Sequence, residues 1–91
     1  MIIELTRFRA GSRAALLAAR PAMLADFSTD RSGFIGARLV ELTGGEWLDI
    51  VEWRSAADLT ASREKGANLP GIGAFFSAID ELVVSEAGVA A

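Results

Sequence analysis

The chain has neither cysteine nor histidine among its 91 residues, and it has only 2 prolines. Without cysteine there can be no disulfide bonds, thiolate metal sites or cysteine nucleophiles. Without histidine there can be no Ser-His-Asp triad, imidazole metal site or proximal haem ligand. A phosphate-binding glycine loop is also missing, because Gly71 and Gly73 lead into a helical stripe instead of joining a strand to a helix. We therefore expect no metal, no nucleotide and no cofactor.

The sequence has little positive charge and no long apolar run. It carries 9 lysines and arginines against 12 acidic residues, a net charge of −3, with no basic cluster. Nucleic acid and anionic membranes are therefore poor candidate partners. No apolar run approaches the ~20 residues that span a bilayer, and Glu4 interrupts a signal-peptide pattern. We expect a soluble, unprocessed cytoplasmic protein.

The length predicts a single domain covering residues 1–91, since one core is typically built from about 100–150 residues. A chain this short buries only roughly 60–65 % of its unfolded surface. Hydrophobic residues make up 52 % of the sequence. Both observations favour association with another copy.

Residues 34–54 predict a β-hairpin, with Gly44 and Gly45 in a tight turn that requires positive φ. The register we predict pairs Thr43 with Glu46. One face then carries Phe34, Arg38, Val40, Leu42, Trp47, Asp49, Val51 and Trp53. The other carries Ile35, Ala37, Leu39, Leu48 and Ile50, with Glu41, Glu52 and Arg54 towards its edges. A sheet with one wet face alternates apolar and polar residues, so both faces of this one need a cover. Helices can cover one face, and a second copy of the chain can cover the other.

The remaining elements are a strand over 2–9, helices over 12–28 and 55–65, a short helix after Pro70, and a strand over 82–84. In the first helix we expect Leu17, Leu24 and Phe27 to form the apolar line. Pro21 should kink or split that helix. The tail after the last strand should be frayed.

This order, β-α-β-β-α-(short α)-β, predicts an α+β, ferredoxin-like fold with a four-stranded antiparallel sheet and helices on one face. The other face of the sheet is left bare.

Arg38 and Asp49 form the sharpest candidate pair for function, because the predicted register places them diagonally on one face between Trp47 and Trp53. In a mostly apolar pocket, such a pair could orient a polar group on an aromatic ligand. The alternative is a structural ion pair at a dimer seam or at the rim of the sheet. A buried pair would then add little net stability, because desolvation offsets the attraction.

Five other side chains have both a structural and a functional interpretation. Trp53, which we expect opposite Gly36, fits the core, whereas Trp47 beside the turn should be partly exposed and able to donate to a ligand. Asn68 fits a turn, although its amide could point between the helices and the sheet. Phe76 is expected in the core, and Glu4 could be a buried base. Trp53, Asn68, Phe76 and Glu4 are the candidate substrate-binding residues.

The run GGEWLDIVEWRSAADLTAS (44–62) resembles the antibiotic biosynthesis monooxygenase family of small dimeric α+β barrels. So do Gly11, ARPAM at 19–23, Gly33-Phe34 and the segment 70–80, so that the resemblance covers nearly the whole chain. It implies a homodimer through the bare sheet faces and a pocket between sheet and helices. It also implies a cofactor-free oxygenase of aromatic polyketides, since several members have that activity. Others degrade haem, and many have no assigned reaction.

The haem-degrading branch of that family carries an asparagine, a tryptophan and a histidine at its site. Here Glu4 and Ser62 occupy the first two positions and histidine is absent, so haem degradation is disfavoured.

The favoured hypothesis is a cofactor-independent monooxygenase acting on a small aromatic or enolisable hydrophobic substrate. Its catalytic candidates are Asp49, Arg38 and Trp47, with Arg38, Trp47 and Asn68 as donors to an oxyanion and Asp49 or Glu4 as base. The alternatives are a barrel dimer that binds a hydrophobic metabolite without turning it over, and an interaction module without a ligand.

Overall fold

The computed structural model describes all of residues 1–91. Its elements are β1 (Ile2–Arg9), α1 (Arg13–Asp30), β2 (Phe34–Glu41), a 3-10 turn (Thr43–Gly45), β3 (Glu46–Trp53), α2 (Ala56–Lys65), α3 (Pro70–Ser77) and β4 (Glu81–Val89). This order confirms the α+β, ferredoxin-like arrangement expected from the sequence. None of the three α-helices combines the length and hydrophobicity that crossing a bilayer requires.

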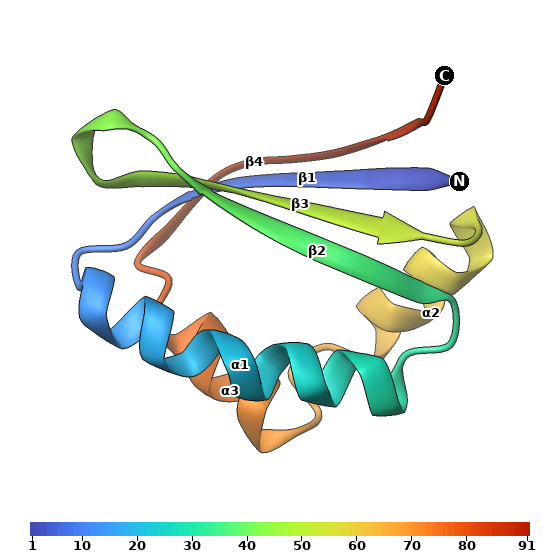
Figure 1. The fold of residues 1–91 in the computed structure, drawn as a ribbon, viewed down its shortest axis with the longest axis horizontal. Helices are drawn as coiled ribbons and strands as arrows, with labels where there is room; N and C mark the ends of the chain where they lie inside the picture. Colours follow the sequence, from blue (N-terminus) through green and yellow to red (C-terminus); the bar gives the residue numbers. More distant parts are fainter.

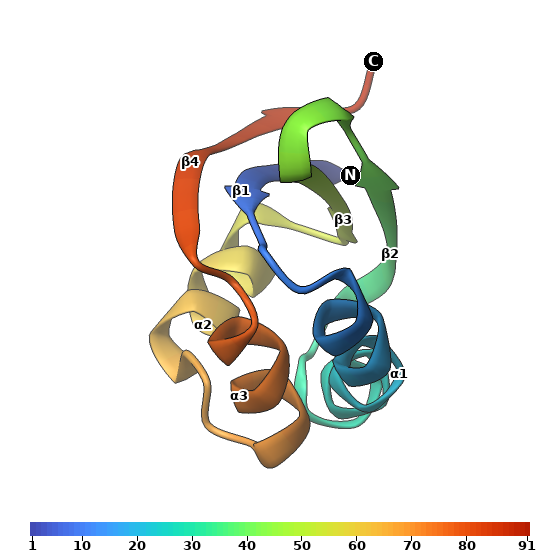
Figure 2. The ribbon, with the colours of Figure 1, turned by 90° about the vertical axis from the view of Figure 1, so that its left-hand side faces the viewer.

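The four strands form one antiparallel sheet in the order β2-β3-β1-β4. All three helices lie on the same side of this sheet, which leaves two layers (Figure 1). Viewed from the end, β2 and β4 form the two edges and β1 and β3 lie between them (Figure 2). The sheet therefore has one face against helices and one face with no cover from its own chain.

Local sequence signals set the ends of several elements. Gly44 and Gly45 adopt φ of 74° and 75°, as the predicted turn between β2 and β3 requires. Ser12 caps α1 by accepting from the backbone N–H of Ala15 at 3.2 Å. Ser55 caps α2 by accepting from the N–H of Asp58 at 3.2 Å. The Ser55 hydroxyl also donates to the Asp58 carboxylate at 2.7 Å, and this bond is the main reason that the pKa of Asp58 lies below its usual value.

The first helix differs from the prediction. α1 continues through Pro21 to Asp30 as one helix, so the expected split does not occur. Pro21 lies on the exposed side, where water can reach the carbonyl that proline leaves without a donor. The buried line of α1 is Leu16, Arg20, Met23 and Phe27, whereas the predicted Leu17 is exposed.

The last strand is longer than expected. β4 runs from Glu81 to Val89 and pairs with β1 over that whole length, so the segment predicted to fray is mostly part of the sheet. All its residues are exposed. The strand is extended by backbone hydrogen bonds to Ile2–Arg9. The hydropathy of the sequence gives no sign of this pairing.

The hairpin register also differs from the prediction. Glu41 pairs with Trp47 and Leu39 with Asp49, one residue away from the predicted pairing. A shift of one residue moves side chains of one strand to the opposite face. A β-bulge between Phe34 and Gly36 then places Phe34, instead of Gly36, opposite Trp53.

The core lies between the sheet and the helices. Phe27, Phe34 and Trp53 contact one another there, with ring centroids 5.6–6.2 Å apart in stacked and edge-to-face geometries. The eleven buried hydrophobic residues are Phe8, Ala10, Leu16, Met23, Phe27, Trp47, Val51, Trp53, Leu59, Ile72 and Phe75.

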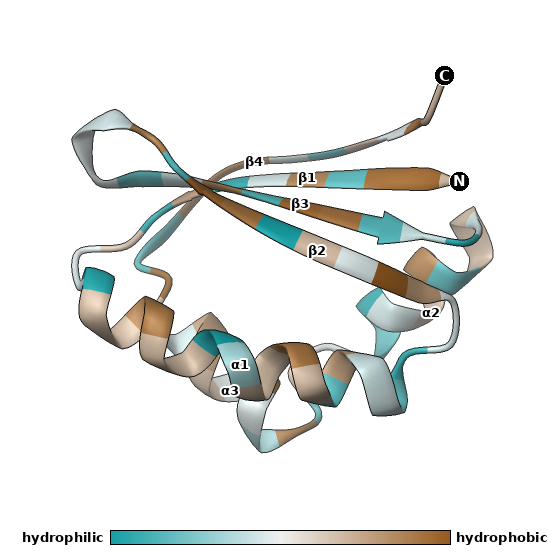
Figure 3. Ribbon diagram, in the orientation of Figure 1, coloured by the Kyte–Doolittle hydropathy of each residue, from teal (hydrophilic) through white to brown (hydrophobic).

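The opposite face of the sheet mixes apolar and charged side chains. On β3 the burial alternates strictly, so Leu48, Ile50 and Glu52 point away from the helices. Ile50 pairs with Leu5 of β1, which puts two apolar side chains side by side on the central strands. Apolar stretches are visible along β1, β2 and β3 in Figure 3. We call the side of the sheet that points away from the helices the open face. Its residues are Ile3, Leu5, Arg7, Arg9, Gly36, Arg38, Val40, Glu46, Leu48, Ile50, Glu52, Val84 and Glu86.

One end of the open face carries an ion-pair cluster. Arg7 and Arg9 each approach a different carboxylate oxygen of Glu46 to 2.6 Å. The Arg7 hydrogen bond, followed by the charge of Arg9, holds the pKa of Glu46 below its usual value of 4.5. The cluster therefore fixes charge at the turn end of the hairpin, while Leu5 and Ile50 form an apolar pair further along the two central strands.

Close packing of α1 against α3 yields a stability prediction. A Cβ at Gly71 would lie 2.6 Å from the backbone oxygen of Ala22, whereas a Cβ at Gly73 would meet nothing within 4 Å. We expect Gly71→Ala to lower the free energy of unfolding by about 1–3 kcal/mol through overpacking. The matched control Gly73→Ala should raise it by up to about 1 kcal/mol, because alanine is the better helix former. Urea denaturation of the two variants measures both, and equal stabilities would contradict the packing argument.

Candidate functional site

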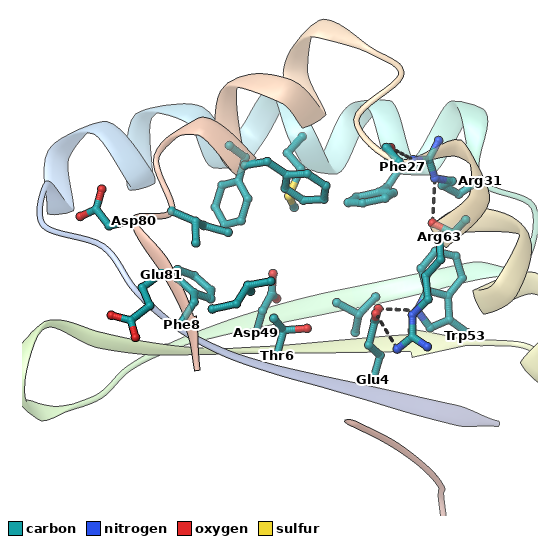
Figure 4. A pocket seen from close by; sticks show the side chains of 18 residues that line it. Glu4, Thr6, Phe8, Phe27, Arg31, Asp49, Trp53, Arg63, Asp80 and Glu81 are labelled. Atoms are coloured by element: carbon teal, nitrogen blue, oxygen red, sulfur yellow. Dashed lines mark hydrogen bonds and ion pairs between the residues drawn. The ribbon is translucent and has the colours of Figure 1, made fainter. Parts of the chain in front are cut away.

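A cavity of about 580 Å³ lies between the helix-facing side of the sheet and the helices (Figure 4). It is lined by Glu4, Thr6, Phe8, Met23, Phe27, Arg31, Asp49, Val51, Trp53, Ser62, Arg63, Gly66, Phe75, Phe76, Ile79, Asp80, Glu81 and Leu82. Half of these residues are hydrophobic. A mostly apolar hollow with a few convergent polar groups is typical of small-molecule sites.

One end of the cavity holds a carboxylate with two hydrogen-bond donors. Glu4 of β1 and Trp53 of β3 share the helix-facing side of adjacent strands, and Glu4 accepts from the indole Nε1–H at 3.1 Å. Arg63 of α2 reaches the other carboxylate oxygen at 3.4 Å. The three side chains converge in Figure 4. A carboxylate fixed by an indole in an apolar wall is a suitable candidate for a general base.

Arg31, at the end of α1, closes the cavity behind this group. Its side chain is only 2 % exposed and donates to Ser62 Oγ at 2.8 Å, to Asn68 Oδ1 at 2.7 Å and to the Gly66 carbonyl at 2.5 Å. Its guanidinium also stacks 5.1 Å above the Phe27 ring. These contacts tie the ends of α1 and α2 to the segment before α3.

Asp30 completes this polar cluster. It accepts from the Asn68 amide at 3.0 Å, from Lys65 Nζ at 3.2 Å and from Arg31 at 2.8 Å. The hydrogen bond from Asn68, followed by that from Lys65, holds the pKa of Asp30 below its usual value of 3.8. The cluster is therefore charged at neutral pH and holds the wall of the cavity in place.

Asp49 forms a second buried polar group in the wall. Its two oxygens accept from Arg20 of α1 at 2.6 and 2.8 Å, in a bidentate ion pair with both side chains 10 % exposed. The same guanidinium stacks 5.1 Å from the centre of the Phe75 ring. Both oxygens of Asp49 are thus already engaged by one partner.

The predicted pairing of Arg38 with Asp49 is wrong. Because of the register shift, Arg38 pairs with Ile50 on the open face, while Asp49 points towards the helices. Arg38 instead borders a hollow of about 280 Å³ formed with Gly36, Ala37, Ile50 and Glu52. The partner of Asp49 is instead Arg20, a residue of α1.

The other predicted site residues divide into two groups. Glu4, Trp53 and Phe76 line the cavity together with Asp49, and Phe76 is 43 % exposed there instead of buried in the core. Trp47 is 3 % exposed, against the expectation of partial exposure, and does not line the cavity. Asn68 does not line it either, because its amide contacts Arg31 and Asp30.

Three arginines of this region were not predicted from the sequence: Arg20, Arg31 and Arg63. For Arg20 a signal existed, since it lies at helical spacing between Leu16 and Met23 on the buried side of α1. A charge on an apolar helix face indicates a buried partner. Arg31 and Arg63 follow no such pattern. Arg31 is the C-cap of α1 and Arg63 lies on α2, and only the packing of these two helices brings them to the cavity.

The far end of the cavity is acidic. Asp80 accepts from the backbone N–H of Gly11 at 2.6 Å, and Glu81 lies next to it near Phe8 (Figure 4). No group of three or more acidic, histidine or cysteine side chains is arranged to hold a metal ion.

Neither a protein-family model nor a curated protein matches this chain. Solved structures do. A candidate antibiotic biosynthesis monooxygenase from Bordetella bronchiseptica matches with a TM-score of 0.79 at 13 % identity, over 99 % of this chain and 96 % of the other. A similar candidate from Caulobacter crescentus matches with a TM-score of 0.73 at 13 % identity, over 99 % and 89 %.

SnoaB, a cofactor-independent oxygenase from Streptomyces nogalater, matches with a TM-score of 0.69 at 20 % identity, over 96 % of this chain and 87 % of the other. At such identities the likeness establishes the fold, and the resemblance inferred from sequence is confirmed at that level. The chain has the ferredoxin-like α+β fold of the structures described as antibiotic biosynthesis monooxygenases and of SnoaB.

Proposed function

We propose that this protein is a cofactor-independent oxygenase that acts on a small aromatic or enolisable molecule. The observation that carries the proposal is the apolar cavity with Glu4 held by Trp53 and Arg63 at one end. The likeness in fold to SnoaB, an oxygenase of this kind, supports the same reaction class.

The proposed reaction converts an activated CH₂ group and O₂ into a carbonyl group and water. A base first removes one proton from the substrate carbon, and the resulting carbanion transfers one electron to O₂. The radical pair then forms a C–O bond, and protonation gives a hydroperoxide. Loss of water, with departure of the second C–H proton, leaves the carbonyl. The substrate itself is the reductant, so the protein needs only to bind, deprotonate and stabilise an oxyanion.

Glu4 is the base in this proposal. Its Oε1 is fixed by the Trp53 indole at 3.1 Å, while its Oε2 has only the longer contact with Arg63 at 3.4 Å. Asp49 is less suited to this role, because Arg20 occupies both its oxygens at 2.6 and 2.8 Å. Phe76 and Trp53 supply apolar surface for the ring of the substrate.

The proposal includes a homodimer formed through the open face. Leu5 and Ile50 pair on the central strands with no cover from their own chain, and exposed apolar patches of this kind mark interaction sites. A second copy is the simplest cover, because two identical faces can pack isologously. The helix side of each subunit would then keep its cavity accessible.

Oxygen uptake with anthrone as trial substrate tests the proposal. We expect Glu4→Gln to lower the rate about a hundredfold, the lower range for loss of a general base. The glutamine oxygen can still accept from Trp53, so the wall of the cavity is preserved.

Glu52→Gln is the matched control, since Glu52 lies on the open face, away from the cavity. It should leave the rate unchanged. Equal rates for wild type and Glu4→Gln would remove Glu4 as the base. Binding of anthrone-type ligands without any oxygen uptake would overturn the oxygenase proposal.

A further inference from the structure

Two arginines line the cavity, and their surroundings differ. Arg31 is 2 % exposed and donates to Ser62, Asn68, Asp30 and Gly66, so its guanidinium is locked into the wall. Arg63 is 52 % exposed, and its one hydrogen bond is the 3.4 Å contact with Glu4. Arg63 is therefore the only cation at the cavity with the freedom to turn towards a ligand.

Glu4 does not depend on this contact. When Arg63 turns away, Glu4 still accepts from the Trp53 indole at 3.1 Å, so the carboxylate keeps one hydrogen bond. Its Oε2 then has no donor and can take up a proton. The arrangement couples the position of Arg63 to the availability of the base.

We propose that Arg63 is a specificity-determining residue: it turns away from Glu4 to bind a carboxylate or phenolate on an aromatic ligand, so that a bound anion makes the base more available than a neutral ligand does. The coupling to the base rests on the proposed function of Glu4. The substrate class it defines is an aromatic molecule with an anionic group near the carbon that reacts. A guanidinium suits this group because it binds carboxylates bidentately.

The other charges along the cavity confine an anion to this end. Asp80 lies at the opposite end and repels it (Figure 4). Glu81, beside Asp80, lies 3.9 Å from Arg9, which offsets part of its charge. Asp49, in the wall between, is neutralised by Arg20 at 2.6 Å. The ring then lies along the apolar wall that includes Phe76.

Isothermal titration with anthracene-2-carboxylate and the neutral, similarly shaped anthracene-2-carboxamide tests this inference. We expect wild type to bind the carboxylate about tenfold more tightly, as for a hydrogen bond to a charged group. Arg63→Met should abolish this preference and leave carboxamide binding unchanged. The control Arg54→Met should keep it, since Arg54 pairs with Asp58 and does not line the cavity.

The Glu4→Gln variant provides a second binding test, which remains informative even if Arg63→Met does not fold. Removal of the carboxylate releases Arg63, so this variant should bind anthracene-2-carboxylate several-fold more tightly than wild type. Equal binding of the two ligands by wild type, a preference retained in Arg63→Met, or no gain in Glu4→Gln would each overturn the inference.

Failure of this inference and failure of the oxygenase proposal give different results. An anion preference that follows Arg63, in a protein that consumes no oxygen, supports the anion site and removes the oxygenase. Oxygen uptake with anthrone that depends on Glu4, without any anion preference, keeps the oxygenase and overturns the role of Arg63.

Discussion

Asp49→Asn is expected to lower the free energy of unfolding by about 3–5 kcal/mol, the usual cost of removing one partner of a buried ion pair. Arg20 would keep its charge, with its side chain 10 % exposed, and lose both hydrogen bonds of 2.6 and 2.8 Å to a carboxylate. An asparagine offers one acceptor oxygen and no charge in return. The stacking of Arg20 on Phe75 does not replace a counter-charge.

Urea denaturation monitored by circular dichroism measures this loss. The double variant Arg20→Met/Asp49→Leu should recover most of it, because apolar side chains of similar size remove the buried charges together. Glu41→Gln serves as control. It breaks the exposed pair of Arg13 and Glu41, and should change the stability by less than about 1 kcal/mol. An Asp49→Asn variant as stable as this control would show that the buried pair is not a structural unit.

The stability of Asp49→Asn determines what its rate of oxygen uptake can show. An Asp49→Asn variant that loses oxygen uptake supports a catalytic role only if the variant is folded at the assay temperature. The double variant separates the two effects, since it lacks the carboxylate but should retain stability. We expect it to consume oxygen, because the proposed base is Glu4, at one end of the cavity, which the double variant leaves intact.

The course of the chain could be predicted from sequence because its signals are local. Gly44 and Gly45 mark the turn through their positive φ, and Ser12 and Ser55 mark helix starts through side chains that accept from nearby N–H groups. Hydrophobic periodicity placed the strands and helices in the right order. These features depend on neighbours within a few residues, which a single sequence contains.

The partner of Asp49 could not be predicted in the same way. The β-bulge between Phe34 and Gly36 and the one-residue shift move Arg38 to the open face, and nothing in the local sequence records that shift. Arg20 is 29 positions away from Asp49 and reaches it only through the packing of α1 on the sheet. Glu4 and Trp53 were identified as candidates, but their contact also depends on the pairing of β1 with β3.

Ile50→Glu is expected to dissociate the homodimer proposed through the open face. Ile50 points away from the helices and pairs with Leu5, so in an isologous dimer it would lie against the partner. Burial of one such side chain contributes about 1.5–3 kcal/mol. The change occurs once in each subunit, so about 3–6 kcal/mol is lost, at least a hundredfold in the dissociation constant.

Sedimentation equilibrium at micromolar concentration measures this change. Leu17→Glu is the matched control, because Leu17 is an exposed leucine on α1, on the opposite side of the molecule from the open face. It should remain as dimeric as wild type. A wild-type chain that sediments as a folded monomer would contradict the dimer outright. An Ile50→Glu variant that stays associated would place the interface elsewhere. In either case the open face would be exposed to solvent in the native protein. Its charged residues, which include Arg7, Arg9 and Glu46, would then keep the protein soluble.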